Sequence, residues 1–303
     1  MTSKRTLSAC SAVAAACLAA ACAQQPPAAP PPAQHPMAVP APAPEPRQPI
    51  AAPEPAAPPP APPPAVPAPL TESQARARDI LMEMANYLAT LPSFSVRMTD
   101  SYDVVQPSGQ KIEFGEKRKL LVQRPSRLRV DTERSDGAHT AANFNGTEIT
   151  LVDAASRIYA STKQPGGLDE SILYFVSDLK MRLPLAMMLM SRLPVELERR
   201  VRGVDYVETS YTFGTPTHHL AVRGDTVDFQ VWVRASGAPL PLRVVITYKN
   251  EPGQPDFRAD FADWNTRPAV TSTTFRLEPP PGAQKVLFAA QLVATRKPGQ
   301  ADK

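Results

Sequence analysis

The segment that decides the fold is SFSVRMTDSYDVV, residues 93–105. From Phe94 to Val104, large apolar side chains alternate with small polar or charged ones. Successive side chains of a strand point to opposite faces of a sheet, so this period of two predicts a strand with one apolar and one polar face. An apolar face must be covered, and the flanking segments are expected to supply partner strands and a covering layer.

The same alternation recurs along the rest of the chain and predicts about ten strands joined by short loops. The segments that carry it are 94–104, 112–122, 127–131, 148–152, 157–161, 206–213, 218–223, 227–234, 242–249 and 256–263. Asn145-Gly146 favours a tight hairpin turn. So many sequential strands predict a mainly antiparallel β protein with helices (α+β), in which an incomplete β-barrel is covered by helices.

A helix is expected to open the domain. Apolar residues between 80 and 91 fall at three- and four-residue spacings with polar residues between them, which is typical of an amphipathic helix. Pro92 cannot continue it, so the helix is predicted over 71–91.

A second helical region is expected after Pro165-Gly166-Gly167, which breaks the sheet. Asp169 is expected to cap one helix there, and Pro184 to begin another over residues 185–193. The run 185–190 is apolar on every side, which predicts burial on two sides or a cavity beside it.

These inserted helices are expected to cover an apolar cavity on the inner face of the sheet. The expected lining residues are Phe94, Val96, Met98, Phe114, Leu120, Phe175, Leu179, Met187 and Met188. Flexible thioether side chains suit a surface that repacks around different apolar ligands. They also fill gaps in ordinary cores, and the sequence leaves both interpretations open.

The N-terminus resembles an export signal with a lipid-attachment site. Met1 to Arg5 is basic, and residues 6–21 form an apolar run too short to span a bilayer comfortably. Small residues precede Cys22, as in the lipobox of bacterial lipoproteins, in which the cysteine is lipidated. The resemblance implies a signal peptide over 1–22 and an anchor on Cys22. Ordinary cleavage after Ala23 would instead release the protein.

A proline-rich segment follows the signal. Of the 37 prolines in the chain, 21 lie between Cys22 and Leu70. Such a segment buries too little apolar surface to offset its ordering entropy, so residues 23–70 are expected to be a disordered linker. At ~3.1 Å per residue, about 45 residues of polyproline II would reach roughly 140 Å. The globular domain is expected over 71–290, with a disordered tail over 291–303.

The residues that carry chemistry form no catalytic constellation in the sequence. All three cysteines lie at or before Cys22, so the domain has no thiol nucleophile and no cysteine ligand for a metal. His218 and His219 are adjacent on a predicted strand and point to opposite faces, so they cannot chelate one ion together. A net charge of +4 is too small for a phosphate-reading surface. We therefore expect no enzyme, no cofactor, no metal and no nucleic-acid partner.

Several motifs together resemble the LolA/LolB-like lipoprotein-carrier superfamily. They are the Arg124-Pro125 turn, the Asn145-Gly146 hairpin, and the segments 228–233, 263–265 and 275–283. The last three look like a branch of predicted periplasmic proteins of unknown function. The resemblance spans roughly residues 71–287. It implies an incomplete antiparallel barrel around a helical lid, with acyl chains in the space between them.

The combined expectation is a lipoprotein of the Gram-negative periplasm that binds lipid or lipoprotein acyl chains, such as palmitate, without catalysis. Ala23 is not the aspartate that retains lipoproteins in the inner membrane of enteric bacteria, so the resemblance implies an anchor in the outer membrane. Two other functions stay open. A periplasmic stress sensor or regulator would contact an envelope protein partner, and a structural envelope lipoprotein would have a filled core.

Overall fold

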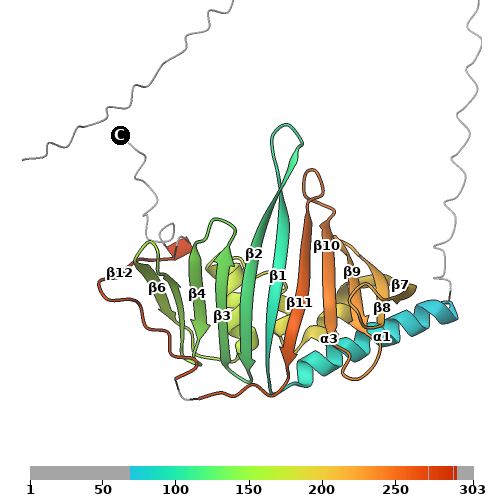
Figure 1. The fold of residues 1–303 in the computed structure, drawn as a ribbon, viewed down its shortest axis with the longest axis horizontal. Coiled ribbons are helices and arrows are strands. Elements are labelled where there is room, and N and C mark those ends of the chain that lie inside the picture. The colour runs from blue at the N-terminus through green and yellow to red at the C-terminus, as the bar shows by residue number, and fades with distance from the viewer. Residues whose placement is uncertain (1–68, 272, 289, 292–303) are drawn as a thin grey trace, which may run out of the picture. The chain divides into compact units, whose positions relative to one another are not determined.

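One large sheet dominates the computed structural model, which describes residues 69–271, 273–288 and 290–291. In this part of the chain, twelve strands pair in the order β12-β6-β5-β4-β3-β2-β1-β11-β10-β9-β8-β7. Their bounds are β1 Ser93–Val105, β2 Lys111–Gln123, β3 Arg127–Arg134, β4 His139–Phe144, β5 Glu148–Asp153, β6 Ile158–Lys163, β7 Val201–Ser210, β8 Thr217–Gly224, β9 Val227–Arg234, β10 Pro241–Tyr248, β11 Asp256–Asn265 and β12 Gln284–Lys285. The edge strands β12 and β7 do not pair with each other, so the sheet is open (Figure 1). The prediction of a mainly β protein with an unclosed sheet is confirmed.

The signal peptide, Cys22, the linker up to residue 68 and the tail from residue 292 lie outside the described residues. The domain bounds predicted from the sequence therefore stay predictions.

The strand pairs are antiparallel, with one exception among the described strands: β12 pairs with β6 in parallel. The sequence did not predict this strand. After β11 the chain runs along the lower edge of the sheet in Figure 1 and returns to β6. On the way, the Asn143 side chain donates a hydrogen bond to the Phe275 carbonyl oxygen at 2.8 Å, which holds the returning segment against β4.

Burial along β1 follows the alternation of the sequence. Phe94, Val96 and Met98 are at most 3% exposed, whereas Arg97 and Thr99 point to solvent. The same face of β2 carries Leu120 and Val122, which are paired across the ladder with Val96 and Phe94. The sheet thus has an apolar inner face and a polar outer face, as predicted.

Helix α1, Glu72–Thr90, forms because its start is capped and one of its faces is apolar. The Thr71 hydroxyl accepts a hydrogen bond from the Gln74 backbone N–H at 3.2 Å, and the Gln74 side chain accepts one from the Thr71 N–H at 3.1 Å. The buried side of the helix carries Leu81, Met84 and Leu88 and packs against β7, β8 and β9 (Figure 1). No helix in the described part combines the length and apolarity that a bilayer span requires.

The inserted region is less helical than the sequence predicted. Its elements are α2 Leu168–Leu173, the π-helical turn η1 Tyr174–Asp178, the 3-10 turn η2 Ala186–Leu189 and α3 Leu193–Arg200. A helix over 185–193 is wrong, because Leu185 has φ of 55° and a right-handed helix excludes this left-handed backbone. The proline in the first turn of a helix is Pro194 of α3, and not Pro184.

The prediction that Asp169 caps the helix after residue 167 is wrong. The N-cap is Gly167, which has no capping side chain. The Asp169 carboxylate instead accepts hydrogen bonds from the backbone N–H and the hydroxyl of Ser191, at 2.9 and 2.8 Å. This residue therefore joins the start of α2 to the connection between η2 and α3.

Candidate functional site

An apolar cavity of about 310 Å³ lies between the inner face of β9 and β10 and the helical elements α1, η2 and α3. Its lining side chains come from alternate strand positions and from the apolar faces of the helices. They are Leu81, Met84, Leu185, Ala186, Met187, Met188, Leu193, Leu197, Val201, Val227, Phe229, Val231, Val244 and Ile246. Arg200, Asp225 and Thr226 are exposed and stand at its rim. The cavity thus combines an apolar interior with a polar opening.

Of the residues predicted to face a cavity, Met187 and Met188 line this one. Phe94, Val96, Met98 and Leu120 face the inserted region, but the space left between them and Met188 and Leu189 is only about 20 Å³. That volume is roughly one water-sized probe. These four residues therefore belong to the packed core. The apolar cavity of about 310 Å³ lies instead over β9 and β10.

The other predicted lining residues are placed elsewhere. Phe175 borders a space of about 30 Å³ between α2 and the strands β3 to β5. Leu179 is buried in the core at 2% exposure. Phe114 is 41% exposed and stacks on Tyr102, with ring centroids 6.0 Å apart. It lies on the hairpin between β1 and β2, which projects beyond the rest of the sheet (Figure 1), so the helices do not reach it.

The wall formed by β9 and β10 was missed by sequence reasoning. Phe229, Val231, Val244 and Ile246 alternate with polar residues in the same way as the residues of any half-buried strand. The sequence contains no signal that separates a strand facing a cavity from one facing a packed core, because the difference depends on where the helices end.

A hollow of about 910 Å³ opens between the hairpins β1–β2 and β10–β11, and strand β10 contributes to both this hollow and the apolar cavity. Tyr102, Tyr248 and Phe257 contribute its aromatic walls, and Arg182 stands over the Tyr102 ring, with the guanidinium carbon 4.2 Å from the ring centroid. Burial raises the pKa of the Tyr248 hydroxyl, and the charge of Glu251 adds to the effect.

A buried ion pair interrupts the apolar inner face of β1 and β2. The carboxylate of Asp100 lies 2.6 Å from the Arg118 guanidinium, and the two residues are 2% and 8% exposed. Arg118 also pairs with Glu116. Burial raises the pKa of Asp100 and lowers that of Arg118, because desolvation opposes the charge on each partner. In the period-two pattern of β1 and β2, Asp100 and Arg118 stand where an apolar residue is expected. This departure from the pattern could have identified both residues from the sequence.

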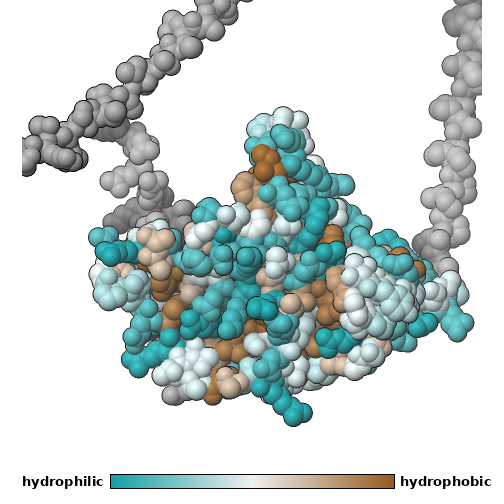
Figure 2. Space-filling model, viewed as in Figure 1, coloured by the Kyte–Doolittle hydropathy of each residue, from teal (hydrophilic) through white to brown (hydrophobic). Residues whose placement is uncertain are grey.

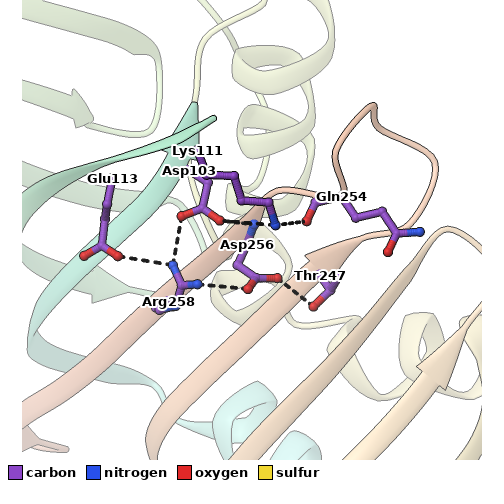
Figure 3. Close-up of polar contacts among 7 residues, drawn as sticks. All are labelled: Asp103, Lys111, Glu113, Thr247, Gln254, Asp256 and Arg258. Atoms are coloured by element: carbon purple, nitrogen blue, oxygen red, sulfur yellow. Dashed lines mark hydrogen bonds and ion pairs between the residues drawn. The ribbon is translucent and has the colours of Figure 1, made fainter. Parts of the chain in front are cut away.

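The outer face carries a polar network where the projecting hairpin extends past β11 (Figure 3). Arg258 binds Asp103 at 3.0 Å, Glu113 at 3.4 Å and Asp256 at 2.9 Å, and Lys111 lies 3.8 Å from Asp103. Burial alone would raise the pKa of Asp103, but the Asp256 backbone N–H and the Arg258 guanidinium outweigh it and lower that pKa. The network ties β1 and β2 to β11 and balances the charge of its carboxylates.

The face seen in Figure 2 is otherwise mainly hydrophilic, with apolar side chains near the tip of the projecting hairpin and in scattered patches elsewhere. The exposed apolar residues of that hairpin are Val104, Ile112 and Phe114.

The two adjacent histidines of β8 point to opposite faces, as predicted. His218 Nδ1 lies 3.1 Å from the Tyr206 hydroxyl, and His219 stacks on Trp232 with ring centroids 4.0 Å apart. Within the described ranges, no group of three His, Cys, Asp or Glu side chains is placed to hold a metal ion.

Comparisons with known proteins identify the family. A family model described as "Predicted periplasmic protein (DUF2092)" matches residues 77–289. No curated protein matches the chain. Similar solved structures include an uncharacterized conserved protein from Thermus thermophilus, with a TM-score of 0.42 and 10% identity over 70% of this chain and 99% of that one.

Two further similar structures are those of named proteins. Mycobacterium tuberculosis lipoprotein LppX has a TM-score of 0.42 and 13% identity, covering 66% of this chain and 100% of its own. A LolA superfamily protein from Nitrosomonas europaea has a TM-score of 0.35 and 12% identity, covering 66% and 97%. The branch of predicted periplasmic proteins expected from the sequence motifs is confirmed by the family model. Because the family model matches more than half of the sequence, the chain belongs to the DUF2092 family of predicted periplasmic proteins.

Proposed function

We propose that the domain binds acyl chains of lipids or lipoproteins in the periplasm and performs no catalysis. The observation that carries the proposal is the apolar cavity of about 310 Å³ between β9–β10 and the helical elements. Small-molecule sites are typically mostly apolar clefts of about 300–1,000 Å³. An acyl chain that enters the cavity would gain about 0.8 kcal/mol for each CH₂ group removed from water.

The side chains of the cavity support a ligand of variable shape. Met84 of α1 and Met187 and Met188 of η2 meet there, and unbranched thioethers adjust their rotamers at little cost. The short turn η2, which carries two of them, covers the cavity as a 3-10 turn and not as a long helix. Such a cover can move without opening the sheet, which suits reversible entry of a ligand.

The proposed location follows from the family and from the N-terminal sequence. The family is described as periplasmic. The signal peptide over 1–22, lipidation of Cys22 and the linker over 23–70 would tether a domain spanning 71–290 to the outer membrane. The linker would then let the domain reach ligands at a distance from its anchor.

Filling the cavity tests the proposal. Ala186 lines the cavity from η2, and Ala186→Trp would occupy the space that an acyl chain needs. The purified full chain is titrated with a fluorescent fatty acid, and organic extracts of it are analysed by mass spectrometry. We expect the wild type to bind the probe and Ala186→Trp to lose most of that binding.

The matched control is Val195→Trp, which adds the same side chain at a position of α3 that is 63% exposed. It is expected to bind as the wild type does, and far-ultraviolet circular dichroism checks that both variants fold. If the wild type binds no fatty acid, or if Ala186→Trp binds it as well as Val195→Trp does, acyl chains do not occupy this cavity.

A regulatory module that contacts an envelope protein is the second candidate. Edge strand β7 favours this candidate, because the unpaired edge of a sheet can accept a strand from a partner protein. Two apolar side chains are also exposed there: Val207 on β7 is 51% exposed, and Tyr211, just after the strand, is 71% exposed. Val207→Asp should then release a copurified membrane protein without changing fatty-acid binding. A structural lipoprotein with a filled core would bind neither the probe nor a protein.

A further inference from the structure

The apolar cavity and the larger hollow lie along the same strand. Val244 and Ile246 of β10 line the cavity, and Tyr248, two residues further on the same face, lines the hollow. From Val244 to Tyr248 the strand rises about 13 Å at ~3.3 Å per residue. A linear ligand that lies along β10 would therefore have its chain in the cavity and its other end in the hollow.

Arg182 is placed to meet that end. It is exposed on the segment between η1 and η2 and borders the hollow. Among the described residues it makes no ion pair and no hydrogen bond, and its guanidinium instead stacks on the Tyr102 ring at 4.2 Å. Stacking on the ring orients the guanidinium but leaves its donors available for an anion.

Arg182 makes no ion pair with the carboxylates that border the hollow, although it lies close enough to the buried Asp100 carboxylate for the two charges to attract each other. Asp103 and Asp256 border it, but both carboxylates are held by Arg258 on the outer face (Figure 3). Glu251 is exposed at the rim and has no ion-pair partner in the described part of the chain. Among the described residues that border the hollow, Arg182, next to Tyr102, is thus a cation without an ion-pair partner, and Glu251, at the outer edge, is a carboxylate without one.

The backbone that presents Arg182 is strained. Lys180 and Leu185, on either side of it, both have φ of 55°, a left-handed conformation that non-glycine residues adopt at a cost. The Met181 backbone N–H donates a hydrogen bond to the Phe175 carbonyl oxygen at 3.1 Å, which fixes the segment against η1. Strained backbone of this kind is common at ligand-binding segments.

We propose that Arg182 binds the anionic head group, a carboxylate or a phosphate, of an acyl ligand whose chain lies along β10 in the apolar cavity. This inference rests on the proposed acyl-binding function and specifies the chemical class of its ligand. A charge-assisted hydrogen bond holds the head group at the hollow, and Glu251 repels it from the outer edge.

The test compares a charged probe with its neutral analogue. The purified full chain is titrated at pH 7.5 with cis-parinaric acid and with cis-parinaric acid methyl ester, which have the same acyl chain. We expect the wild type to bind the acid about tenfold more tightly than the ester, and Arg182→Gln to remove this difference while leaving ester binding unchanged. Glu251→Gln should strengthen binding of the acid alone.

Lys180→Gln is the matched control, because it removes an exposed positive charge from the same segment but from a residue that does not line the hollow. It should preserve the preference for the acid. Dodecyl phosphate should compete with the acid more strongly than inorganic phosphate at the same concentration. Equal competition by the two would mean that the site takes a free anion, and the proposal would fail.

Two results would overturn the head-group role while the acyl-binding function stands. One is equal binding of acid and ester by the wild type, and the other is an equal loss of both in Arg182→Gln, which would assign Arg182 a packing role against Tyr102. If neither probe binds the wild type, the proposed function itself fails.

Discussion

Asp100 and Arg118 are charged residues on a face that otherwise excludes water. They lie on neighbouring strands, and each occupies a position where the alternation calls for an apolar side chain. A buried pair of this kind is held by its mutual attraction but opposed by the desolvation of both charges. One carboxylate oxygen of Asp100 has no hydrogen-bond partner among the described residues, which adds to that cost.

Breaking the pair should therefore cost more than removing it. Arg118→Leu leaves the Asp100 carboxylate buried without its partner, and we expect a loss of about 3–5 kcal/mol in the free energy of unfolding. The double variant Asp100→Leu/Arg118→Leu should be at least about 2 kcal/mol more stable than the single one, because the buried Asp100 carboxylate is gone and only Glu116, the other partner of Arg118, is left without its cation. Urea unfolding measures both.

Arg97→Leu serves as the control, since Arg97 pairs with Asp263 on the outer face and its side chain is 68% exposed. It should change the free energy of unfolding by less than about 1 kcal/mol. Additive losses in the double variant would show that Asp100 and Arg118 contribute independently and would contradict this account of the pair.

At the level of single elements, the strands were predictable and the inserted region was not. A period of two is a local property, and it identified β1, including its inner and outer faces, from the residues alone. The insertion depends on contacts between residues far apart in the sequence. Asp169 bonds to Ser191, 22 positions away, and Leu185 takes a left-handed backbone that no helical pattern indicates. Met187 and Met188 line the cavity, but the strands opposite them were not identified from the sequence.

Asp169 should control how easily the insertion opens. Asp169→Ala removes the bonds to Ser191, so we expect faster amide hydrogen exchange over residues 186–193 and a loss of about 1 kcal/mol in global stability. Asp178→Ala is the control, because Asp178 is exposed and its side chain makes no hydrogen bond within the described ranges. Unchanged exchange in Asp169→Ala, or equal acceleration in both variants, would show that Asp169 does not hold this segment.

At the scale of the whole molecule, the open sheet and the uneven distribution of helices determine where the cavity and the hollow lie. Helix α1 and α3 pack at the β7 end, and the hairpin between β1 and β2 projects past them (Figure 1). The cavity lies between β9–β10 and the elements α1, η2 and α3, and the hollow opens between the hairpins β1–β2 and β10–β11. Sequence reasoning could not locate either space, since each is lined by residues that are far apart in the sequence.

A lipid anchor on Cys22 would bring this molecule to a membrane. Metabolic labelling with an alkyne-tagged fatty acid should mark the wild type and should not mark Cys22→Ser, which should appear in the soluble periplasmic fraction. A single acyl chain binds membranes only marginally, so the anchor needs more than one chain to be stable, and losing the cysteine removes all of them. Cys10→Ser is the matched control, because Leu7-Ser8-Ala9-Cys10 also resembles a lipid-attachment site but leaves almost no apolar segment before the cut. Label that persists in Cys22→Ser and disappears in Cys10→Ser would move the anchor to Cys10 and would add residues 11–22 to the tether.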